Sequence, residues 1–476
     1  MTTIVVKGKD VRMKTPSSTP AARGATTAPE QRRYVRTVAS IAAFAGLLFG
    51  YDTGVMSGAL LFVSPEFGMS AAEEGLVTSM LLVGAAVGAL TGSATADRIG
   101  RRATLMVGGV IFIVGSVWCA LSGSVLMLSS ARTLLGVAVG AVSIVAPMYI
   151  SEMVPATVRG KMVSLNTLMI VVGQLAAYLV NSLLAPTENW QLMLGLAAVP
   201  GLILTIGMYF LSDTPVWLAR QGRVDEARAT ATRAGMDLAE LTEITEQDAA
   251  QREAQQGQWS RLREHRWLKI TVLVAALLGI TQQITGVNAI VYFAPTMMNQ
   301  VGLSTQNSVY TSIVIGLVSV VACWVGLQVI DRIGRKRLLT IGLVGNVIAL
   351  AILAPVYGAA HGNTALAMVS LALMAIFIAS QQAAVSPTTW LLISELVPTQ
   401  IRGLGMGLAG LALWTANWAV AQFFLPLVEA LGATSTFVMF AVLGLVALGF
   451  VRAMVPETMG RSLEDVSREL ECKYSK

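Results

Sequence analysis

Apolar stretches of about 20 residues recur along this chain, and each is long enough to cross the roughly 30 Å hydrocarbon core of a bilayer as an α-helix. We find twelve, at residues 37–62, 75–95, 103–122, 125–150, 162–185, 191–211, 268–294, 309–330, 338–358, 364–394, 404–428 and 433–454. Helices are the expected spanning form because backbone polar groups find no water in hydrocarbon. A mean hydropathy of +0.68 also excludes an ordinary soluble domain. The sequence predicts an all-α polytopic membrane protein with twelve transmembrane helices.

The basic residues between these stretches predict the orientation of the chain. Lys and Arg occur in the N-terminal tail, in the breaks near 98–102, 159–161, 220–269, 332–337 and 402, and in the C-terminal tail. The intervening breaks, near 63–74, 123–124, 186–190, 295–308, 359–363 and 429–432, contain none. Both termini are therefore expected on the cytoplasmic side of the plasma (inner) membrane. This asymmetry explains the sequence pI of about 9.3, so nucleic-acid binding is not expected.

The polar residues give little support to an enzyme. Cys119, Cys323 and Cys472 lack the spacing of a disulfide framework or metal site, and His265 and His361 are isolated. The chain also has no glycine-rich phosphate loop and no credible catalytic triad. We expect no enzymatic activity, no cofactor and no metal.

Two charges lie well inside apolar stretches, namely Asp52 in the first and Arg132 in the fourth. A charge in hydrocarbon costs several kcal/mol, so it persists only where it is paired, neutralised or wetted. At 1.5 Å per helical residue, Asp52 lies roughly 22 Å from the inner face, and Arg132 lies about seven residues from the outer end of its span. Both are then in the outer half, at depths that allow contact. The pair predicts ion-coupled transport, with a proton favoured and Na⁺ left open.

Two ordered motifs occur twice. Residues 97–102 (Asp-Arg-Ile-Gly-Arg-Arg) return as residues 331–336 (Asp-Arg-Ile-Gly-Arg-Lys), and residues 151–155 (Ser-Glu-Met-Val-Pro) return as residues 394–398 (Ser-Glu-Leu-Val-Pro). Each copy falls at the same place in its half, after the second span and at the end of the fourth. The repeat predicts two six-helix bundles with a substrate site between them near the midplane.

The repeat also predicts the domains. These are a disordered cytoplasmic tail at 1–35, an N-terminal bundle at 36–211, a cytoplasmic helical linker at 212–266, a C-terminal bundle at 267–455 and a cytoplasmic tail at 456–476.

The repeated motifs suggest a gate on the cytoplasmic face. Their arginines can pair with the preceding Asp, with helix C-termini or with the Glu of the second motif. Such pairs would hold that face in one state and break in the other; simple orientation by positive charge is the alternative. The predicted gating residues are Asp97, Arg98, Arg101, Glu152, Arg159, Asp331, Arg332, Arg335, Glu395 and Arg402.

Amide and indole side chains are unexpectedly frequent inside the spans. They include Asn166, Gln174 and Asn181 in the fifth, Gln282, Gln283 and Asn288 in the seventh, Gln381, Gln382 and Trp390 in the tenth, and Trp414 and Asn417 in the eleventh. Any one amide could simply join helices, but together they suit a polyhydroxyl ligand. Pro387 and Gly286 should bend or weaken the tenth and seventh spans, either to close over a ligand or only to improve packing.

Four motifs resemble signatures of the sugar porter family of the major facilitator superfamily, in the family's order. They are residues 50–55 (Gly-Tyr-Asp-Thr-Gly-Val) with Gly58, the two Asp-Arg-Ile-Gly-Arg loops, residues 282–288 (Gln-Gln-Ile-Thr-Gly-Val-Asn) and residues 456–464 (Pro-Glu-Thr-Met-Gly-Arg-Ser-Leu-Glu). The resemblance implies the major facilitator fold, alternating access and a monosaccharide or polyol substrate. It also implies proton coupling through Asp52 and Arg132.

The resemblance carries substrate binding onto Gln174, Gln282, Gln283, Asn288, Tyr292, Trp390, Trp414 and Asn417. This chain departs from the family pattern at Ser319, where Asn is frequent, and at Gln381, where an aromatic residue is frequent. Both are retained as predicted substrate contacts. Leu413 replaces a Gln of some members, and residues 213–218 depart from the family's Pro-Glu-Ser-Pro-Arg motif.

The segments 381–390 and 402–407 are similar to bacterial myo-inositol/proton symporters of the family. The predicted function is therefore proton-coupled symport of a monosaccharide or cyclitol, with myo-inositol favoured over a hexose or pentose. An uncoupled sugar facilitator, a non-transporting nutrient sensor and a drug exporter are the alternatives. The expected partners are the sugar or polyol, the proton and the lipid bilayer, and a monomer is expected.

Overall fold

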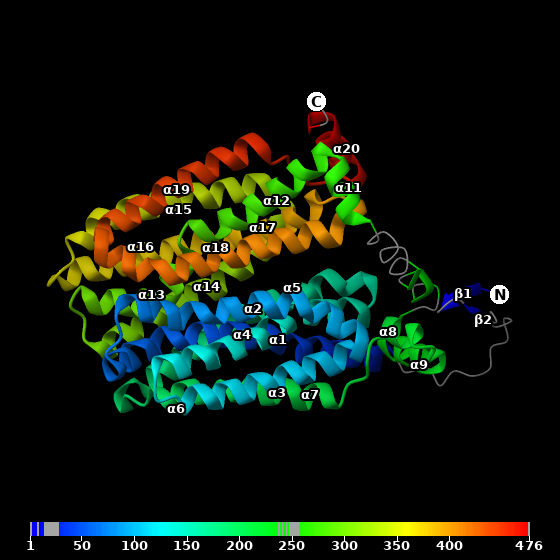
Figure 1. Ribbon diagram of the computed structural model, residues 1–476, viewed down its shortest axis with the longest axis horizontal. Coiled ribbons are helices and arrows are strands. Elements are labelled where there is room, and N and C mark those ends of the chain that lie inside the picture. Colours follow the sequence, from blue (N-terminus) through cyan, green and yellow to red (C-terminus); the bar gives the residue numbers. More distant parts are fainter. Residues whose placement is uncertain are drawn as a thin grey trace.

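The computed structural model describes residues 2–6, 9–13, 28–236, 239, 241–243, 245–246 and 257–474. Within these residues, twelve helical segments are long and apolar enough to span a membrane, as predicted. They form two bundles of six spans (Figure 1).

The first bundle is built from long, nearly uninterrupted helices. Its elements are α1 (Ala28–Phe67), α2 (Ala71–Ile99), α3 (Arg101–Ala120), α4 (Val125–Met153), α5 (Ala156–Leu184) with the 3₁₀ turn η1 (Ala185–Thr187), and α6 (Trp190–Gly195) with α7 (Ala198–Tyr209). Ser70 caps α2 through a reciprocal pair of hydrogen bonds with Glu73, so this helix begins where a capping box is formed.

The second bundle contains two interrupted spans. Its elements are α12 (Arg266–Ile284) with α13 (Val287–Gln300), α14 (Thr305–Ile333), α15 (Arg335–Gly358), α16 (Thr364–Ser380) with the π-helical η2 (Gln381–Val385) and α17 (Ser386–Leu396), the 3₁₀ turn η3 (Thr399–Ile401) with α18 (Arg402–Leu431), and α19 (Ala433–Met454).

The remaining elements lie at one end of the molecule, which we call the linker end (Figure 1). They are the strands β1 (Thr2–Val6) and β2 (Lys9–Met13), the linker helices α8 (Pro215–Arg220), α9 (Val224–Ala234) and α11 (Gln258–Glu264), and the C-terminal α20 (Leu463–Tyr474). The opposite end is called the far end.

The prediction of a wholly disordered tail at 1–35 is wrong for part of that segment. Residues 2–6 and 9–13 pair as an antiparallel hairpin, in keeping with the strand preference of the β-branched Thr, Ile and Val that fill β1. The first helix begins at Ala28, eight residues before 36, with Pro29 in its first turn, where its missing N–H is tolerated. Residues 14–27 of the predicted tail lie outside the described residues.

The two bundles share one hydrophobic core only toward the far end. The largest buried apolar cluster joins the first bundle to far-end residues of the second, including Leu350, Phe377, Trp414, Phe424 and Phe440. A separate cluster fills the linker-end half of the second bundle, including Leu268, Leu339, Leu392, Val451 and Leu470. The bundles are therefore held together at the far end and have separate cores at the linker end.

Polar contacts between the bundles follow the same distribution. At the start of α2, Gln422 Nε2 of α18 donates to the Ala72 carbonyl at 3.2 Å, and Ser79 Oγ donates to Gln422 Oε1 at 2.8 Å. Tyr178 Oη donates to the Val291 carbonyl at 3.1 Å. All three bonds lie in the far-end half, so the far end is the closed end of this structure.

Glycines allow α2 and α4 to approach closely. A Cβ on Gly136 would lie 2.0 Å from the Leu81 carbonyl oxygen, and one on Gly84 would lie 2.0 Å from the Thr133 carbonyl oxygen. Real side chains do not fit at such distances, so these two helices can pack this way only through glycine.

Gly136→Ala should lower the thermal unfolding midpoint of the purified protein, because overpacking of this kind costs about 1–3 kcal/mol. Gly410 also lies within a spanning helix, but its Cβ would meet open space. Gly410→Ala is therefore the matched control and should melt at or slightly above the parental temperature. Equal midpoints for the two variants would contradict the close packing of α2 on α4.

Candidate functional site

Asp52 and Arg132 form a fully buried ion pair inside the first bundle. Arg132 Nη1 lies 2.8 Å from Asp52 Oδ1, and the two side chains are 0% and 1% exposed. Arg132 Nε also donates to the Val77 carbonyl of α2 at 3.3 Å. Asp52 Oδ2 and Arg132 Nη2 have no hydrogen-bond partner among the described residues. The predicted contact is confirmed, and it ties α1, α2 and α4 together.

The seventh span breaks where the sequence predicts weakness. Its first part, α12, ends at Ile284, and α13 starts at Val287 after Gly286, whose φ is +86°. Glycine adopts such a left-handed conformation without the steric penalty of a Cβ. The break places Gln282 and Gln283 at the end of one helix and Asn288 at the start of the next.

The tenth span also changes geometry near its middle. Residues Gln381–Val385 are π-helical, and α17 begins at Ser386 with Pro387 in its first turn. Proline cannot donate to the carbonyl four residues earlier, and π-helical bulges of this kind often mark functional sites. The predicted bend at Pro387 thus takes the form of a widened turn immediately before it.

Amides from the seventh and eleventh spans meet beside the helix break. Asn288 Nδ2 donates to Gln283 Oε1 at 2.8 Å and to Asn417 Oδ1 at 2.7 Å. Gln282 and Gln174 are buried, yet neither side-chain oxygen accepts a hydrogen bond within the described residues. Since an unpaired buried acceptor costs about 1–3 kcal/mol, these two oxygens are suited to hydroxyl donors of a ligand.

The other predicted substrate contacts differ in their surroundings. Tyr292 is 1% exposed, and the Trp414 ring lies 5.8 Å from the Phe49 ring across the two bundles. Trp390 is 42% exposed in the linker-end half of the tenth span. Ser319 Oγ donates to the Ile315 carbonyl of its own helix at 2.8 Å, which leaves the oxygen able to accept.

Gln381 is less available than the sequence suggests. It is 0% exposed. Its Nε2 donates to the Gln282 carbonyl at 3.0 Å, and its Oε1 accepts a hydrogen bond from Asn346. Both ends of the amide are thus engaged by the protein, and Gln381 lies behind the predicted binding residues instead of among them.

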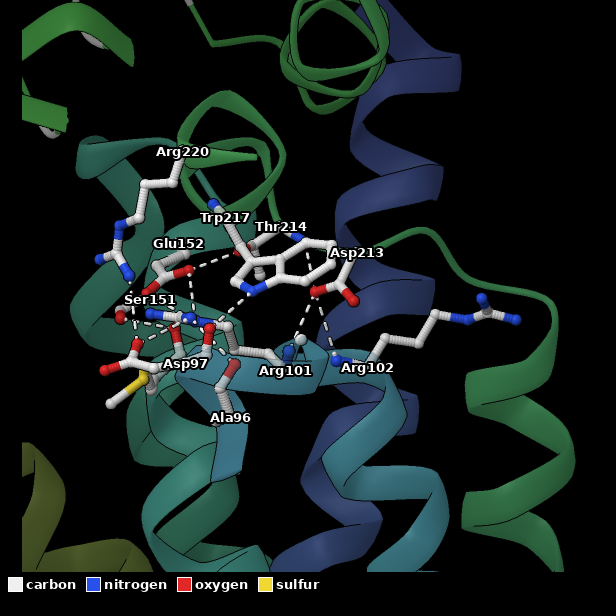
Figure 2. Close-up of polar contacts among 12 residues, drawn as sticks. Ala96, Asp97, Arg101, Arg102, Ser151, Glu152, Asp213, Thr214, Trp217 and Arg220 are labelled. Carbon is white, nitrogen blue, oxygen red and sulfur yellow. Dashed lines mark hydrogen bonds and ion pairs between the residues drawn. The ribbon is translucent and has the colours of Figure 1, made fainter. Parts of the chain in front are cut away.

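A compact charge network surrounds Arg101 at the linker end of the first bundle (Figure 2). Arg101 Nη1 lies 3.1 Å from Asp97 Oδ1, and its Nε lies 3.1 Å from Glu152 Oε2. The linker helix α8 joins this network because Arg220 Nη1 lies 3.1 Å from the same Asp97 oxygen and Trp217 Nε1 donates to the Asp97 carbonyl. The network connects α2, α3 and α4 to the linker.

Asp213 anchors the start of α3 in the same network (Figure 2). Its Oδ1 accepts from the backbone N–H groups of Arg101 at 3.0 Å, Arg102 at 3.4 Å and Thr214 at 3.0 Å. Thr214 Oγ1 donates to Glu152. A carboxylate at this position satisfies helix N–H groups that have no partner within the helix.

The second bundle repeats the network with different residues. Arg335 lies 3.1 Å from Asp331 and 3.4 Å from Glu395. Glu457 takes the place of Asp213 and accepts from the N–H groups of Arg335, Lys336 and Arg337. Thr458 Oγ1 donates to Glu395, as Thr214 does to Glu152. The internal repeat therefore has a third element, which the predicted gating set lacks.

The remaining predicted gating residues are less engaged. Arg98 and Arg332 are exposed, and no ion pair of theirs occurs among the described residues. Arg402 Nη2 donates weakly to the Ser394 carbonyl at 3.4 Å. Arg159 lies at the start of α5.

Six residues of the two networks are absent from the sequence prediction, namely Asp213, Thr214, Trp217, Arg220, Glu457 and Thr458. The signal available for four of them was an acidic residue followed directly by a threonine after the last span of each half, at residues 213–214 and 457–458.

Substitutions at Asp213 separate its hydrogen bonds from its charge. Asp213→Asn keeps an oxygen that can accept the backbone N–H bonds, whereas Asp213→Ala leaves those groups unpaired at a cost of about 1–3 kcal/mol. The thermal unfolding midpoint should therefore fall more in the Ala variant than in the Asn variant. Equal losses would indicate that the hydrogen bonds do not stabilise this end of α3.

The stability difference between the parent and Asp213→Asn should also depend on pH. Burial raises the pKa of the Asp213 carboxyl, partly offset by its backbone hydrogen bonds. The folded protein then holds this proton to a higher pH than the unfolded chain, so the stability contributed by Asp213 declines as pH rises through the raised pKa. As the pH rises above about 4, the usual pKa of an aspartate in an unfolded chain, the Asn variant should therefore gain stability relative to the parent. A difference that stays constant with pH would contradict this.

Comparison with known proteins agrees with these features. Residues 38–470 match the family described as "Sugar (and other) transporter". The chain is 39% identical over 437 residues to the "Probable metabolite transport protein CsbC" of Bacillus subtilis, with 91% of this chain and 94% of that protein covered. It is 37% identical over 445 residues to the "Major myo-inositol transporter IolT" of the same organism, with coverages of 92% and 94%.

A solved structure with the same architecture is the inward open conformation of the xylose transporter XylE from E. coli. The TM-score is 0.77 at 28% identity, with 93% of this chain and all of that chain covered. The family match, the twelve spans and the duplicated bundles lead to one conclusion. This chain is a multi-pass plasma-membrane protein that belongs to the sugar transporter family of the major facilitator superfamily.

Proposed function

We propose that this protein is a proton-coupled symporter of a monosaccharide or cyclitol, with myo-inositol as the favoured substrate. The observation that carries the proposal is the buried Asp52–Arg132 pair, whose oxygen and nitrogen lie 2.8 Å apart. A carboxylate held in a bilayer without water must either keep its counter-charge or take up a proton. Its protonation state can therefore be linked to the arrangement of the helices that hold it.

In the proposed cycle, protonation of Asp52 releases Arg132 and permits the substrate-loaded carrier to close. Loss of the proton to the cytoplasm lets the pair re-form and resets the carrier. The structure has the pair formed while the bundles share a core at the far end only. That combination fits the stage after proton release, with the linker end facing the cytoplasm.

The orientation proposed here places both termini and the linker in the cytoplasm, because the basic breaks all lie at the linker end. The protein acts as a monomer in this proposal. XylE, which shares the fold, is described as a proton:xylose symporter bound in one structure to 6-bromo-6-deoxy-D-glucose. Its description supports a sugar-like substrate and a proton for this chain.

The amide cluster supports a hydroxylated substrate. Gln283, Asn288 and Asn417 are joined by hydrogen bonds of 2.7 to 2.8 Å, which holds their orientation before a ligand arrives. The free acceptors on Gln174 and Gln282 belong to different bundles. A ring of hydroxyls that bonds both would draw the bundles together, which is the differential contact that a transport cycle needs.

Asp52→Asn should abolish accumulation against a gradient and retain exchange of substrate, because the amide cannot carry the coupling proton. The measurement compares active uptake with counterflow in proteoliposomes under an imposed pH gradient. If substrate flux through the parent protein does not depend on the pH gradient, the protein is an uncoupled facilitator. A variant that still concentrates substrate would remove Asp52 from the coupling step.

Gln282→Ala should weaken substrate binding by roughly tenfold, as expected for the loss of one or two hydrogen bonds, without altering the yield of folded protein. Uptake of radiolabelled myo-inositol, glucose, xylose and galactose into a transport-deficient bacterium, with and without a protonophore, first identifies the substrate. Absence of any uptake would favour the nutrient-sensor alternative. Unchanged affinity in the variant would exclude Gln282 from the site.

A further inference from the structure

The break in the seventh span leaves a backbone acceptor that must be satisfied inside the membrane. In a continuous helix the Gln282 carbonyl would accept from the N–H of Gly286. Here that N–H donates instead to the Gln283 carbonyl at 3.0 Å. An unpaired carbonyl is strongly unfavourable where no water is available, so the break depends on a donor from elsewhere.

That donor comes from the tenth span. Gln381 Nε2 donates to the Gln282 carbonyl at 3.0 Å, while Thr285 Oγ1 reaches the same oxygen only at 3.4 Å. Gln381 is fully buried and lies at the first position of the π-helical turn. One side chain therefore connects the two interrupted spans.

Asn346 of α15 fixes the orientation of that side chain. A carbonyl can only accept, so Gln381 must direct its NH₂ group at Gln282 and its oxygen the other way. Asn346 Nδ2 donates to that oxygen, and both amides are 0% exposed. The donor and acceptor pattern allows a single arrangement, from Asn346 through Gln381 to the Gln282 carbonyl.

The helices around this chain of bonds are packed tightly by glycines. A Cβ on Gly326 of α14 would lie 2.3 Å from the Ala383 carbonyl oxygen, and one on Gly342 of α15 would lie 2.6 Å from the Ala384 Cβ. A Cβ on Gly345 would lie 2.5 Å from Ser380 Oγ. The π-helical turn is thus held between α14 and α15, with Asn346 beside the contact. Its position leaves Gln381 little freedom to move.

We propose that Asn346 is a positioning residue for the sugar site. Through Gln381 it fixes the Gln282 carbonyl, and so it sets where the Gln282 amide, the free acceptor described above, is presented to a ligand. This inference rests on the proposed function, since it concerns the affinity of the same site. It accounts for Gln381 as well, because this one amide donates to the seventh span and accepts from Asn346 at the same time.

The test compares substrate binding with thermal stability in the purified full-length protein. The probe is whichever of myo-inositol, glucose, xylose and galactose the parent binds most tightly. The variants are Asn346→Leu, Gln381→Leu, the double Leu variant, and the exchanged pair Asn346→Gln/Gln381→Asn. Gln258→Leu is the matched control, because Gln258 is a buried amide whose oxygen accepts from the Leu404 N–H at the linker end, away from the amide cluster.

Both single Leu variants should bind the probe about tenfold more weakly and melt at a lower temperature, since each leaves a buried amide without its partner. The double variant should melt above Gln381→Leu, because the Asn346 amide is no longer left without its acceptor, but below the parent, because the Gln282 carbonyl still lacks its donor. It should keep the weak binding. The exchanged pair keeps an amide at both positions but shortens the side chain that has to reach the Gln282 carbonyl. It should therefore bind more tightly than Gln381→Leu and more weakly than the parent. Gln258→Leu should lower the melting temperature and leave the dissociation constant unchanged.

Two results would overturn the proposal. One is an unchanged dissociation constant in both single variants while Gln282→Ala loses binding. The other is recovery of binding together with stability in the double variant, which would make the pair purely structural. If the dissociation constant of Gln282→Ala equals that of the parent, the result contradicts the proposed substrate site itself, whatever the Asn346 variants do. The two failures are therefore distinguishable.

Discussion

Polar groups that this chain carries into the bilayer depend on partners within the protein or on a bound ligand, because hydrocarbon offers none. The buried ion pair of the first bundle and the interrupted helices of the second are two solutions to that one constraint. Asp52 and Arg132 neutralise each other, with Arg132 also bonding a carbonyl of α2. In the second bundle the freed Gln282 carbonyl is satisfied by Gln381. The buried ion pair thus lies in the first bundle and the two interrupted spans lie in the second.

The duplicated bundles preserve their linker-end networks more faithfully than their interiors. Arg101 and Arg335 each bridge an Asp and a Glu, and each network adds an acidic residue that accepts the N–H groups of the following helix. The two networks differ in how far their aspartate side chains are shielded from solvent. Asp97 is 33% exposed beneath Arg220 and Trp217, whereas Asp331 is 76% exposed. The first bundle is therefore more firmly joined to its linker than the second is to its tail.

Much of this could be predicted from the sequence, because membrane helices are constrained by length and by the cost of buried charge. Depth along two helices was enough to predict the contact between Asp52 and Arg132. Gly286 and Pro387 predict the two interruptions. The backbone N–H that Pro387 lacks does not determine which geometry the preceding residues adopt, so the π-helical turn cannot be predicted from the sequence. The start of α1 and the paired strands at 2–6 and 9–13 depend on local propensity in a polar tail, where the hydropathy pattern makes no prediction.

Other features required three-dimensional proximity. Glu457 serves the role of Asp213 with a longer side chain in a different local sequence, so the third repeated element escaped a comparison of residue letters. Asn346 lies on a span with no other amide near it in the sequence, and only the packing of α15 on the π-helical turn brings it to Gln381. The assigned binding and gating roles remain predictions that the geometry accommodates.

The two bundles share their apolar core at the far end and not at the linker end, and this difference determines which conformation the unloaded protein adopts. Parting the bundles at the far end would separate contacts made across them, such as those of α2 with α18 and of Tyr178 with Gly316 of α14. The apolar surface exposed there would cost roughly 25 cal/mol per Å². Parting them at the linker end separates cores that are already distinct. The unloaded protein is therefore closed at the far end. The free energy that opens this end has to come from a ligand or proton bound between the two ends.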